Sequence, residues 1–435
     1  MPGVKKNAMK SNTQEISLVP EKDQPYPLPE GWKWVRLGSI TQIVGGGTPP
    51  SKVKEYYEGG DIPWLSPVDL SNYTDVYISR GKKMITANGL ANSSARMMPA
   101  ETVCLSSRAP IGYVAIAKNP LCTNQGFKSF LPSPFYRPRF LYWYLKGNKP
   151  LLESYASGTT FLELSGTKAA QIEFPLPPLD EQERIVARIE SLFAKLDEAK
   201  EKAEAVLDTF EKRKAAILHK AFAGEFSKSS AEFSTWEEKT AQELFTYVTS
   251  GSRGWAKYYS DSGAVFIRMG NLDHGTIELD LSDIQHVQLP NKAEGQRSRL
   301  QKNDILISIT ADVGMVGLVR DDSFEGYINQ HVALARPSSK EDAEFIAWYL
   351  VSDVGFAQMR KKQRGATKVG LGLDDIRTLQ LKMPPLEEQQ RITRILDSLL
   401  EKEQQSKEAA ETVLEQIDLM KKAILAKAFR GELGN

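Results

Sequence analysis

Two stretches of the chain, one central and one C-terminal, carry hydrophobic residues at alternating steps of four and three positions. This spacing places the apolar side chains on one stripe of an α-helix, as in the seam of a coiled coil. Each stretch should form a helix of about 40 residues, or roughly 60 Å at a rise of 1.5 Å per residue. The residues expected in the seam, and so at the interface with a helical partner, are Ile185, Ile189, Leu192, Leu196, Ile392, Leu396, Leu399 and Ile417.

The ends of both stretches carry helix signals. Each stretch opens after Pro-Pro with acidic residues in the first turn, and Gly224 and Gly431 lie where the helices should stop. The second seam is interrupted by Glu403 and Ser406, which a dry interface between two helices would tolerate poorly. Either the seam is wet at these positions or they face another partner.

The two helical stretches are copies of each other. Pro177–Ile185 returns as Pro384–Ile392, and Ala216–Glu225 returns as Ala423–Glu432. Both pairs share an offset of about 207 positions without a gap, and about half of the roughly fifty aligned residues are identical. Only two copies exist, which argues against a solenoid and for a two-fold device that presents two similar surfaces.

The segments before the two helices resemble each other more weakly. Short apolar runs around Gly-containing turns are typical of strands, and Trp-Tyr-Leu stretches are typical of helices, so each segment should be a mixed α/β globule of about 150 residues. The matched segments are Ser106–Gly112 with Ser308–Gly314, Asn124-Gln125 with Asn329-Gln330, Phe140–Leu145 with Phe345–Leu350, and Gly158–Thr160 with Gly365–Thr367. The predicted order is globule, long helix, globule, long helix.

This order divides the chain into five segments. They are a flexible N-terminal extension (1–28), a first globule (29–177), a central long helix (178–226), a second globule (227–384) and a distal long helix (385–435). The first 28 residues are polar and lack the apolar core of an export signal, and no apolar run approaches the length of a membrane span. Cys104 and Cys122 are the only cysteines, which fits a soluble protein of the reducing cytoplasm.

The net charge of +1 hides an asymmetry between the globules. Residues 31–170 carry 16 Lys and Arg against 8 Asp and Glu, whereas residues 236–380 carry 17 against 20. The first globule therefore has the charge expected for a polyanion partner. In the second, positive charge is concentrated in residues 360–368, which a solvated helix end also explains, and beside the aromatic residues of 253–259. Basic, aromatic and hydroxyl residues coincide in Gly-rich loops of both globules, which favours phosphate contacts.

The sequence lacks the motifs of several enzyme classes. Gly45-Gly46-Gly47-Thr48 has no Gly-Lys-Ser/Thr of a phosphate-binding loop, and no Gly-x-Gly-x-x-Gly opens a strand–helix unit. No Asn-Pro-Pro-aromatic stretch of an amino-methyltransferase is present, and the four histidines have no metal-ligand spacing. Glu198-Ala199-Lys200 lies in the middle of a predicted helix, where a solvated face explains it better than a nuclease element. We therefore expect no catalytic residues and no metal site in this chain.

The chain is predicted to contain two globules, each followed by a long helix. Both helices open with Pro-Pro-Leu-x-Glu-Gln-x-x-Ile and close with Ala-Phe-x-Gly-Glu. This arrangement resembles the DNA specificity subunit of type I restriction–modification systems. The resemblance implies two target-recognition domains, each reading one half of a bipartite DNA sequence. It also implies that the helices form an antiparallel coiled coil that sets the gap between the half-sites and docks two modification subunits. Methylation with S-adenosylmethionine and ATP-driven cleavage would belong to partner subunits, the latter to restriction subunits. In this chain we expect no cofactor.

The candidate DNA contacts follow from the loops and from the matched segments. In the first globule they are Thr48, Ser51, Lys52, Lys54, Arg108 and Gln125, and in the second Ser252, Arg253, Lys257, Gln330, Lys361, Lys362 and Arg364. Side-chain geometry favours guanine for the arginines of positions 108 and 253, adenine for the two glutamines, and phosphate for the lysines. The glutamines could instead satisfy backbone groups, and Arg108 could form an ion pair at the edge of the core.

The second globule has Asp312 where the first has Pro110, and no arginine matches Arg108. The guanine contact predicted for Arg108 therefore has no counterpart at this position of the second globule. The predicted function is sequence-specific binding of double-stranded DNA as part of a type I restriction–modification complex. The alternative is a non-catalytic coiled-coil scaffold with paired protein-binding modules, which would lack the steep salt dependence of DNA binding.

Overall fold

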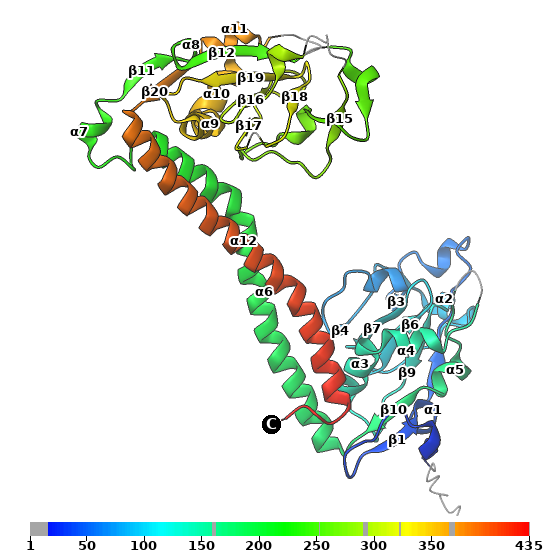
Figure 1. The fold of residues 1–435 in the computed structure, drawn as a ribbon. Coiled ribbons are helices and arrows are strands. Elements are labelled where there is room, and N and C mark those ends of the chain that lie inside the picture. Colours follow the sequence, from blue (N-terminus) through cyan, green and yellow to red (C-terminus); the bar gives the residue numbers. More distant parts are fainter. Residues whose placement is uncertain are drawn as a thin grey trace, which may run out of the picture. The chain divides into compact units, whose positions relative to one another are not determined.

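The computed structural model describes residues 16–158, 162–251, 253–289, 295–321, 323–364 and 370–434. The chain forms two compact units. One unit contains residues 1–201 and 413–435, and the other contains residues 202–412. Each unit therefore combines one globule with about half of each of the two long helices (Figure 1).

The first globule is built on a five-stranded sheet with the order β2-β9-β6-β7-β4. Its strands are β2 (Ile43–Gly45), β9 (Phe127–Phe130), β6 (Val103–Ser107), β7 (Ile111–Ala117) and β4 (Tyr77–Ile78), antiparallel except for β4 beside β7. A smaller sheet contains β5 (Lys83–Ile85), β3 (Ile62–Leu65) and β8 (Cys122–Thr123), and β1 (Lys33–Arg36) pairs with β10 (Glu173–Leu176). The helices are α1 (Leu37–Ile40), α2 (Ala87–Ala91), α3 (Pro138–Gly147), α4 (Lys149–Ser154) and α5 (Gly166–Ala170).

The second globule repeats this plan. Its four-stranded sheet has the order β12 (Phe245–Ser250), β19 (Val332–Pro337), β16 (Ile305–Ser308) and β17 (Val316–Leu318). A second sheet has the order β13 (Tyr259–Ser260), β15 (Gln285–Val287), β14 (Ala264–Ile267) and β18 (Gly326–Ile328), and β11 (Glu237–Thr240) pairs with β20 (Gln380–Met383). The helices are α7 (Ser230–Phe233), α8 (Ala241–Leu244), α9 (Ala343–Val351), α10 (Asp353–Lys362) and α11 (Leu373–Arg377).

The central strand pairs of the two globules correspond. The hairpin β6–β7 corresponds to β16–β17, the antiparallel pair β2–β9 to β12–β19, and the parallel pair β3–β8 to β14–β18. The predicted internal repeat of mixed α/β globules is therefore confirmed. The topology within each globule was not predictable from the sequence, because most of these pairs join strands that are far apart along the chain.

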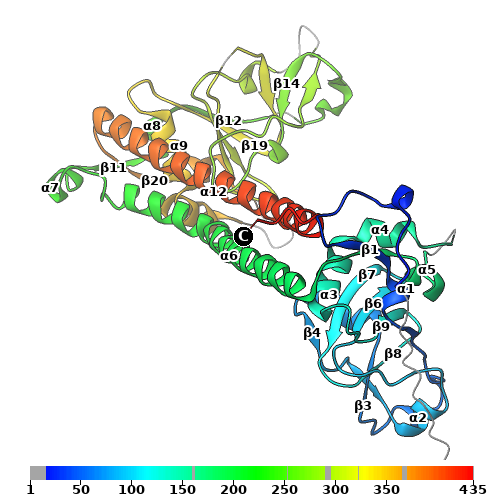
Figure 2. The ribbon, with the colours of Figure 1, turned by 90° about the horizontal axis from the view of Figure 1, so that it is seen from below.

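The long helices are α6 (Leu179–Phe222) and α12 (Leu386–Phe429), with 44 residues each, which confirms the predicted length. Figures 1 and 2 both show them side by side. In the first unit, Asp197 of α6 pairs with Lys421 of α12, and in the second unit Arg213 pairs with Glu403 at 2.7 Å. Within each unit the start of one helix packs beside the end of the other, so the packing is antiparallel.

The predicted seam residues differ in burial. Most are buried, namely Ile185, Ile189, Ile392, Leu396 and Ile417, whereas Leu192, Leu196 and Leu399 are half-buried. Glu403 interrupts the seam, and its charge is compensated by Arg213 of the opposite helix, which offsets part of the cost of removing the carboxylate from water. The Ser406 hydroxyl donates to the Lys402 carbonyl of its own helix, at 2.9 Å. The structure thus explains both polar interruptions locally.

The two repeated motifs anchor each globule to both helices. Phe429, from the closing motif of α12, packs edge-on against Phe140 of the first globule at a centroid distance of 5.2 Å. Phe222, from the closing motif of α6, packs in the same way on Phe345 of the second globule at 5.3 Å. Ile185 and Ile392, from the opening motifs, belong to the same two cores. Each globule therefore rests on the start of one helix and the end of the other.

The glutamine of the opening motif has a structural role that the sequence analysis did not identify. Gln182 is fully buried, where its amide accepts a hydrogen bond from the Arg137 backbone N–H at 2.8 Å and donates to the Pro177 carbonyl at 2.9 Å. Gln389 makes the equivalent bonds to Asp342 and Pro384, each at 2.8 Å. A buried amide that loses its hydrogen-bond partners is costly. These bonds therefore hold the start of each helix in place against its globule.

The described part of the predicted N-terminal extension packs on the first globule, unlike the flexible segment that we expected. Val19 is buried, and its backbone N–H bonds to the Trp34 carbonyl at 2.9 Å. Tyr26 packs edge-on against Trp34 and donates its hydroxyl to the Phe429 carbonyl at 3.1 Å. Burial raises the pKa of Tyr26 to about 12. Scattered apolar residues in a polar segment were enough to dock it, because the globule offers a complementary surface.

Two further observations concern membrane-spanning helices and the cysteines. None of the helices in the described part of the chain combines the length and the apolar content that crossing a lipid bilayer requires. Cys104 and Cys122 are buried free thiols, and burial raises the pKa of Cys104 to about 12 and that of Cys122 to about 11. Both are therefore protonated core residues at neutral pH.

Candidate nucleic-acid interface

In each globule a Gly-rich loop lies against an Asn-Gln turn. A Cβ atom on Gly46 would come within 1.9 Å of the Asn124 carbonyl oxygen, and one on Gly251 within 2.0 Å of the Ile328 carbonyl oxygen. Only glycine allows this approach of two backbones. The asparagine of each turn bonds to backbone, since the Asn124 side chain accepts from the Gly126 N–H at 2.8 Å and the Asn329 side chain from the His331 N–H at 3.0 Å. The glutamine is thereby left to project from the turn.

The first loop gathers several predicted contact residues. The Thr48 hydroxyl donates to the side-chain oxygen of Gln125, which is exposed. Thr48, Ser51 and Lys54 line a cavity of about 490 Å³ together with Lys82 and Lys83, which the sequence analysis missed. Two aromatic side chains hold the backbone of this loop. The Trp64 indole N–H donates to the Gly47 carbonyl at 2.9 Å, and the Tyr57 hydroxyl donates to the Pro49 carbonyl at 2.5 Å. Lys52 is exposed on the same loop.

Arg108 lies at the end of the first hairpin and is already paired. Its guanidinium is 3.6 Å from the Glu163 carboxylate, and Lys128 lies 3.7 Å from the same carboxylate. Burial lowers the pKa of Lys128, and Glu163 opposes that shift. The side chain of Arg108 remains 38% exposed, so the ion pair lies at the surface. Arg108 thus forms an ion pair with Glu163, and a base contact would have to share or displace that carboxylate.

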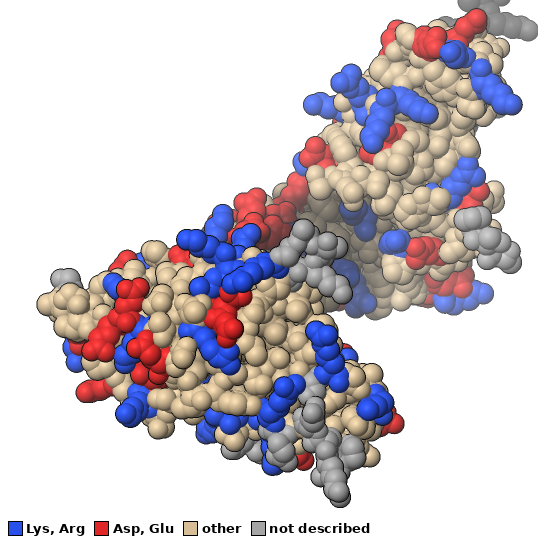
Figure 3. Space-filling model, turned by 90° about the horizontal axis from the view of Figure 1, so that it is seen from above, with Lys and Arg blue, Asp and Glu red and all other residues tan. Residues whose placement is uncertain are grey.

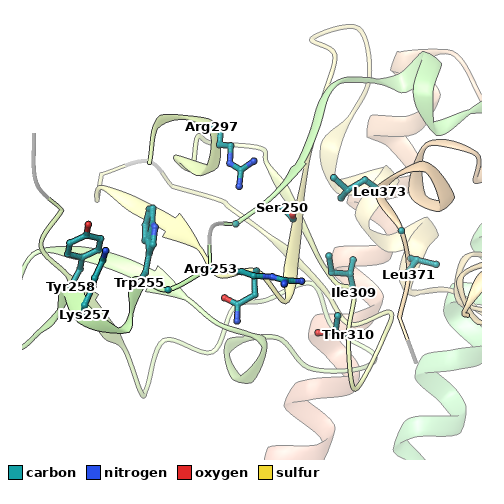
Figure 4. Close-up of a pocket in the computed structure, with 14 residues that line it drawn as sticks. Ser250, Arg253, Trp255, Lys257, Tyr258, Arg297, Ile309, Thr310, Leu371 and Leu373 are labelled. Atoms are coloured by element: carbon teal, nitrogen blue, oxygen red, sulfur yellow. The ribbon is translucent and has the colours of Figure 1, made fainter. Parts of the chain in front are cut away.

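The second globule has an open cleft of about 720 Å³ at the matching place (Figure 4). Its lining includes Arg253, Lys257 and Gln330, which we predicted, and Arg297 and Thr310, which we did not. Figure 4 shows Arg253, Thr310 and Lys257 among the side chains that line the cleft. The Lys257 ammonium lies 4.9 Å from the Tyr258 ring centroid, which favours a cation–π contact. Ser252 lies outside the described residues.

A histidine organises the second cleft. The Nδ1 atom of His331 lies 2.6 Å from the Thr310 hydroxyl, and its Nε2 atom lies 2.8 Å from the amide nitrogen of Gln330. If Gln330 donates to Nε2, the ring proton lies on Nδ1 and is donated to Thr310. Gln330 then keeps one amide N–H and its oxygen, which is the pair that adenine recognition requires. The spacing of the histidines along the sequence does not reveal this arrangement, because Thr310 and His331 come together only in the fold.

The basic segment after α10 reaches the same region. The backbone of Arg364 is joined to Gly370 by two hydrogen bonds of 3.0 Å, and Gly370 is bridged to Thr310 of the cleft. The Arg364 guanidinium contacts Asp375 at 2.7 Å but is 81% exposed. Lys361 is exposed in the last turn of α10, and the Lys362 ammonium donates to the Thr378 hydroxyl at 2.9 Å. Lys368 lies outside the described residues.

Charge alone does not outline these sites. Figure 3 shows Lys and Arg side chains interspersed with Asp and Glu side chains over one face of the molecule. Among the described residues, no group of three or more His, Cys, Asp or Glu side chains has the arrangement of a metal site. The feature common to both globules is therefore geometric. A glycine loop and an Asn-Gln turn lie together, with basic and hydroxyl side chains around them.

Known proteins share this architecture. The family of type I restriction modification DNA specificity domains matches residues 29–207 and 234–416, one match for each globule and part of its helix. The chain is 30% identical over 391 residues to the type I restriction enzyme MjaIX specificity subunit of Methanocaldococcus jannaschii, covering 86% of this chain and 88% of that protein. It is 27% identical over 316 residues to the EcoBI specificity subunit of Escherichia coli, covering 68% of this chain and 66% of that protein.

The fold is also that of a solved protein. The crystal structure of the HsdS subunit from Thermoanaerobacter tengcongensis aligns with a TM-score of 0.68 at 22% identity, over 94% of this chain and 99% of that one. The chain belongs to the family of type I restriction–modification DNA specificity subunits. Its two globules are target-recognition domains, and in this family the specificity subunit is the non-catalytic component.

Proposed function

We propose that each target-recognition domain reads one half of a bipartite DNA target through its glycine loop, its Asn-Gln turn and the adjacent hairpin end. The single observation that carries this proposal is that both domains hold these three elements together, yet with different side chains at matched places. Arg108 of the first domain corresponds to Thr310 of the second, and Gly126 corresponds to His331. Similar frames with different side chains are what a reader of two different half-sites requires.

The proposed contacts divide by chemistry. The lysines of both loops and of the last turn of α10 neutralise phosphates and set the salt dependence. Arg108 and Arg253 read guanine, and Gln125 and Gln330 read adenine. Glu163 holds the Arg108 guanidinium in the absence of DNA, so binding exchanges this ion pair for hydrogen bonds to the uncharged edge of guanine. The cost of breaking the ion pair lowers the affinity for every sequence. It also raises selectivity, because at a wrong base the guanidinium stays on Glu163 and makes no contact with DNA.

We propose further that α6 and α12 set the gap between the half-sites and dock two modification subunits, with restriction subunits as additional partners. Each helix is uninterrupted over 44 residues, or about 66 Å. S-adenosylmethionine and ATP would then be used by those partners. The functional division of the chain follows as residues 29–177 and 227–384 for reading and residues 178–226 and 385–435 for spacing. The buried free thiols support function in the cytoplasm.

A paired insertion tests whether reading and spacing are separate. Asp197 pairs with Lys421, so Glu201 lies opposite the turn that contains Gln416. Inserting four residues after each of these two positions lengthens both helices by about 6 Å and turns the seam only slightly beyond one full turn. The preferred gap should grow by one to two base pairs at about 3.4 Å each, with both half-sites unchanged. The measurement is methylome sequencing of cells that carry the variant with its modification subunits.

Two controls make this experiment decisive. An insertion after Glu201 alone should disturb the helix pair and lower the melting temperature without giving a new gap. Exchange of residues 29–177 for another reader should change one half-site and leave the gap unaltered. If the paired insertion changes the bases that are read, the helices do not act as a spacer. A salt-independent affinity for DNA would instead favour the protein scaffold.

A further inference from the structure

The junction between each globule and the helix that follows it contains a tryptophan and a helix carboxylate, but the two junctions are completed differently. In the first, the Trp143 indole N–H of α3 donates to the Glu190 carboxylate of α6 at 3.1 Å. The Arg139 guanidinium contacts the same carboxylate at 3.0 Å, and it lies 6.0 Å from the Tyr77 ring centroid. One carboxylate, one indole N–H and one guanidinium thus satisfy one another.

The second junction has the tryptophan but not the arginine. The repeat aligns Trp143 with Trp348, Glu190 with Asp397, and Arg139 with Glu344. Trp348 is buried, and its indole N–H has no hydrogen-bond partner among the described residues. Asp397 is one methylene shorter than glutamate, and an acidic side chain replaces the guanidinium. The second copy therefore lacks an arginine at the position that pairs with the helix carboxylate in the first.

A cavity of about 460 Å³ lies at this place in the second unit. It is lined by five acidic side chains and only two basic ones, which are Lys214 and Arg320. Arg320 bridges Glu278, at 2.6 Å, and Glu344, and Arg213 neutralises Glu403. The two remaining acids of the lining, Asp397 and Glu401, form no ion pair among the described residues. Partial removal from water, and then the Glu344 carboxylate, raise the pKa of Asp397 to about 6, although the Arg320 charge opposes the shift.

We propose that this cavity binds a guanidinium group that the chain itself does not supply, with Asp397 and Glu401 as its counter-ions. Phe210 and Trp348 line the same cavity and offer aromatic surfaces to a planar cation. Bound guanidinium keeps Asp397 ionised and oriented, so that the carboxylate accepts from the Trp348 N–H as Glu190 does from Trp143. The chemistry has two sources, an arginine side chain of a bound protein or a free alkylguanidine.

The test uses agmatine as the probe and the full chain labelled with 5-fluorotryptophan. Agmatine should shift one fluorine resonance in a saturable manner, and Trp348→Phe identifies that resonance as the one that disappears. Asp397→Asn should weaken the response about tenfold or more, because a charge-assisted hydrogen bond is lost. Glu190→Gln, the matched change in the first junction, should leave the response intact. No saturable shift at the Trp348 resonance, or equal binding by Asp397→Asn, overturns the proposal.

A second variant guards against a folding defect in the first. Glu344→Arg transfers the arginine of the first junction to the second and should abolish the agmatine response by filling the cavity from within. Persistent binding by this variant contradicts the proposed location. The source is distinguished with wild-type chain assembled with its modification subunits. Loss of the agmatine response in the assembly assigns the site to a partner's arginine, and an unchanged response assigns it to a free alkylguanidine.

Discussion

Replacement of Gly46 by alanine tests whether the glycine loop must approach the Asn-Gln turn as closely as the structure shows. The new Cβ would lie 1.9 Å from the Asn124 oxygen and 2.4 Å from the Thr123 oxygen, whereas ordinary contacts begin at 3.4 Å. Both obstacles are backbone atoms, so no side chain can rotate away. The loop must move by about 1.5 Å, which lengthens the 2.9 Å hydrogen bond from the Gly47 N–H to Thr123.

The magnitude follows from these contacts. Overpacking of this kind costs about 1–3 kcal/mol of the free energy of unfolding. For a unit of this size, 1 kcal/mol corresponds to about 2–4 °C, so Gly46→Ala should lower the melting temperature of the first unit by about 4–8 °C at a cost of about 2 kcal/mol. Because Thr48 is displaced from Gln125, affinity for DNA should fall by about tenfold or more at the first half-site only.

The assay combines calorimetry with fluorescence anisotropy on the chain assembled with its modification subunits. DNA with one or the other half-site randomised shows which half has been affected. Gly45→Ala is the matched control, since a Cβ there meets nothing within 4 Å. Gly251→Ala, with a Cβ 2.0 Å from the Ile328 oxygen, should produce the same defect at the second half-site. If Gly46→Ala melts and binds like Gly45→Ala, the loop does not need this approach and the interface is wrongly placed.

Three further predictions concern base reading, the anchors and pH. Arg108→Ala should weaken binding to the cognate sequence by about 1–3 kcal/mol. Lys52→Ala should weaken binding to all sequences alike and flatten the slope of log affinity against log salt by about one unit. Fluorescence anisotropy across salt concentrations measures both effects, and identical behaviour of the two variants would contradict the prediction. Phe429→Ala should destabilise the first unit by about 3–5 kcal/mol and leave the second unit unchanged in calorimetry, because its ring packs on Phe140. The pKa of Asp397 is about 6 in the folded chain, against the ordinary value of 3.8 in the unfolded chain, so the folded chain binds this proton more tightly. Protonation of Asp397 therefore stabilises the folded state fully below about pH 4, and this stabilisation is lost as the pH rises through about 6. The melting temperature of Asp397→Asn should lack this part of the pH dependence. If its melting temperature depends on pH as that of the wild-type chain does, Asp397 is not the group responsible.

Local regularities in the sequence were sufficient to predict the long helices and the repeat. A helical seam depends on residues three and four positions apart, so its period is visible in the order of residues alone. The same holds for the Pro-Pro starts and for Gly224 and Gly431, both of which adopt positive φ at the helix ends. The glycine loops and Asn-Gln turns were also recognisable, because a backbone approach that excludes a Cβ constrains the residue type directly.

The remaining features depended on contacts between residues that are distant in the sequence. Arg108 meets Glu163 only because the two residues form an isolated β-bridge, and Glu403 is neutralised only because Arg213 faces it from the other helix. His331 was uninformative as an isolated histidine and became interpretable once Thr310 and Gln330 were placed on its two nitrogens. Such pairings depend on strand order and register, which short-range periodicity does not encode. The sequence thus determined the elements and their duplication, whereas the tertiary structure decided which polar groups are free to meet DNA.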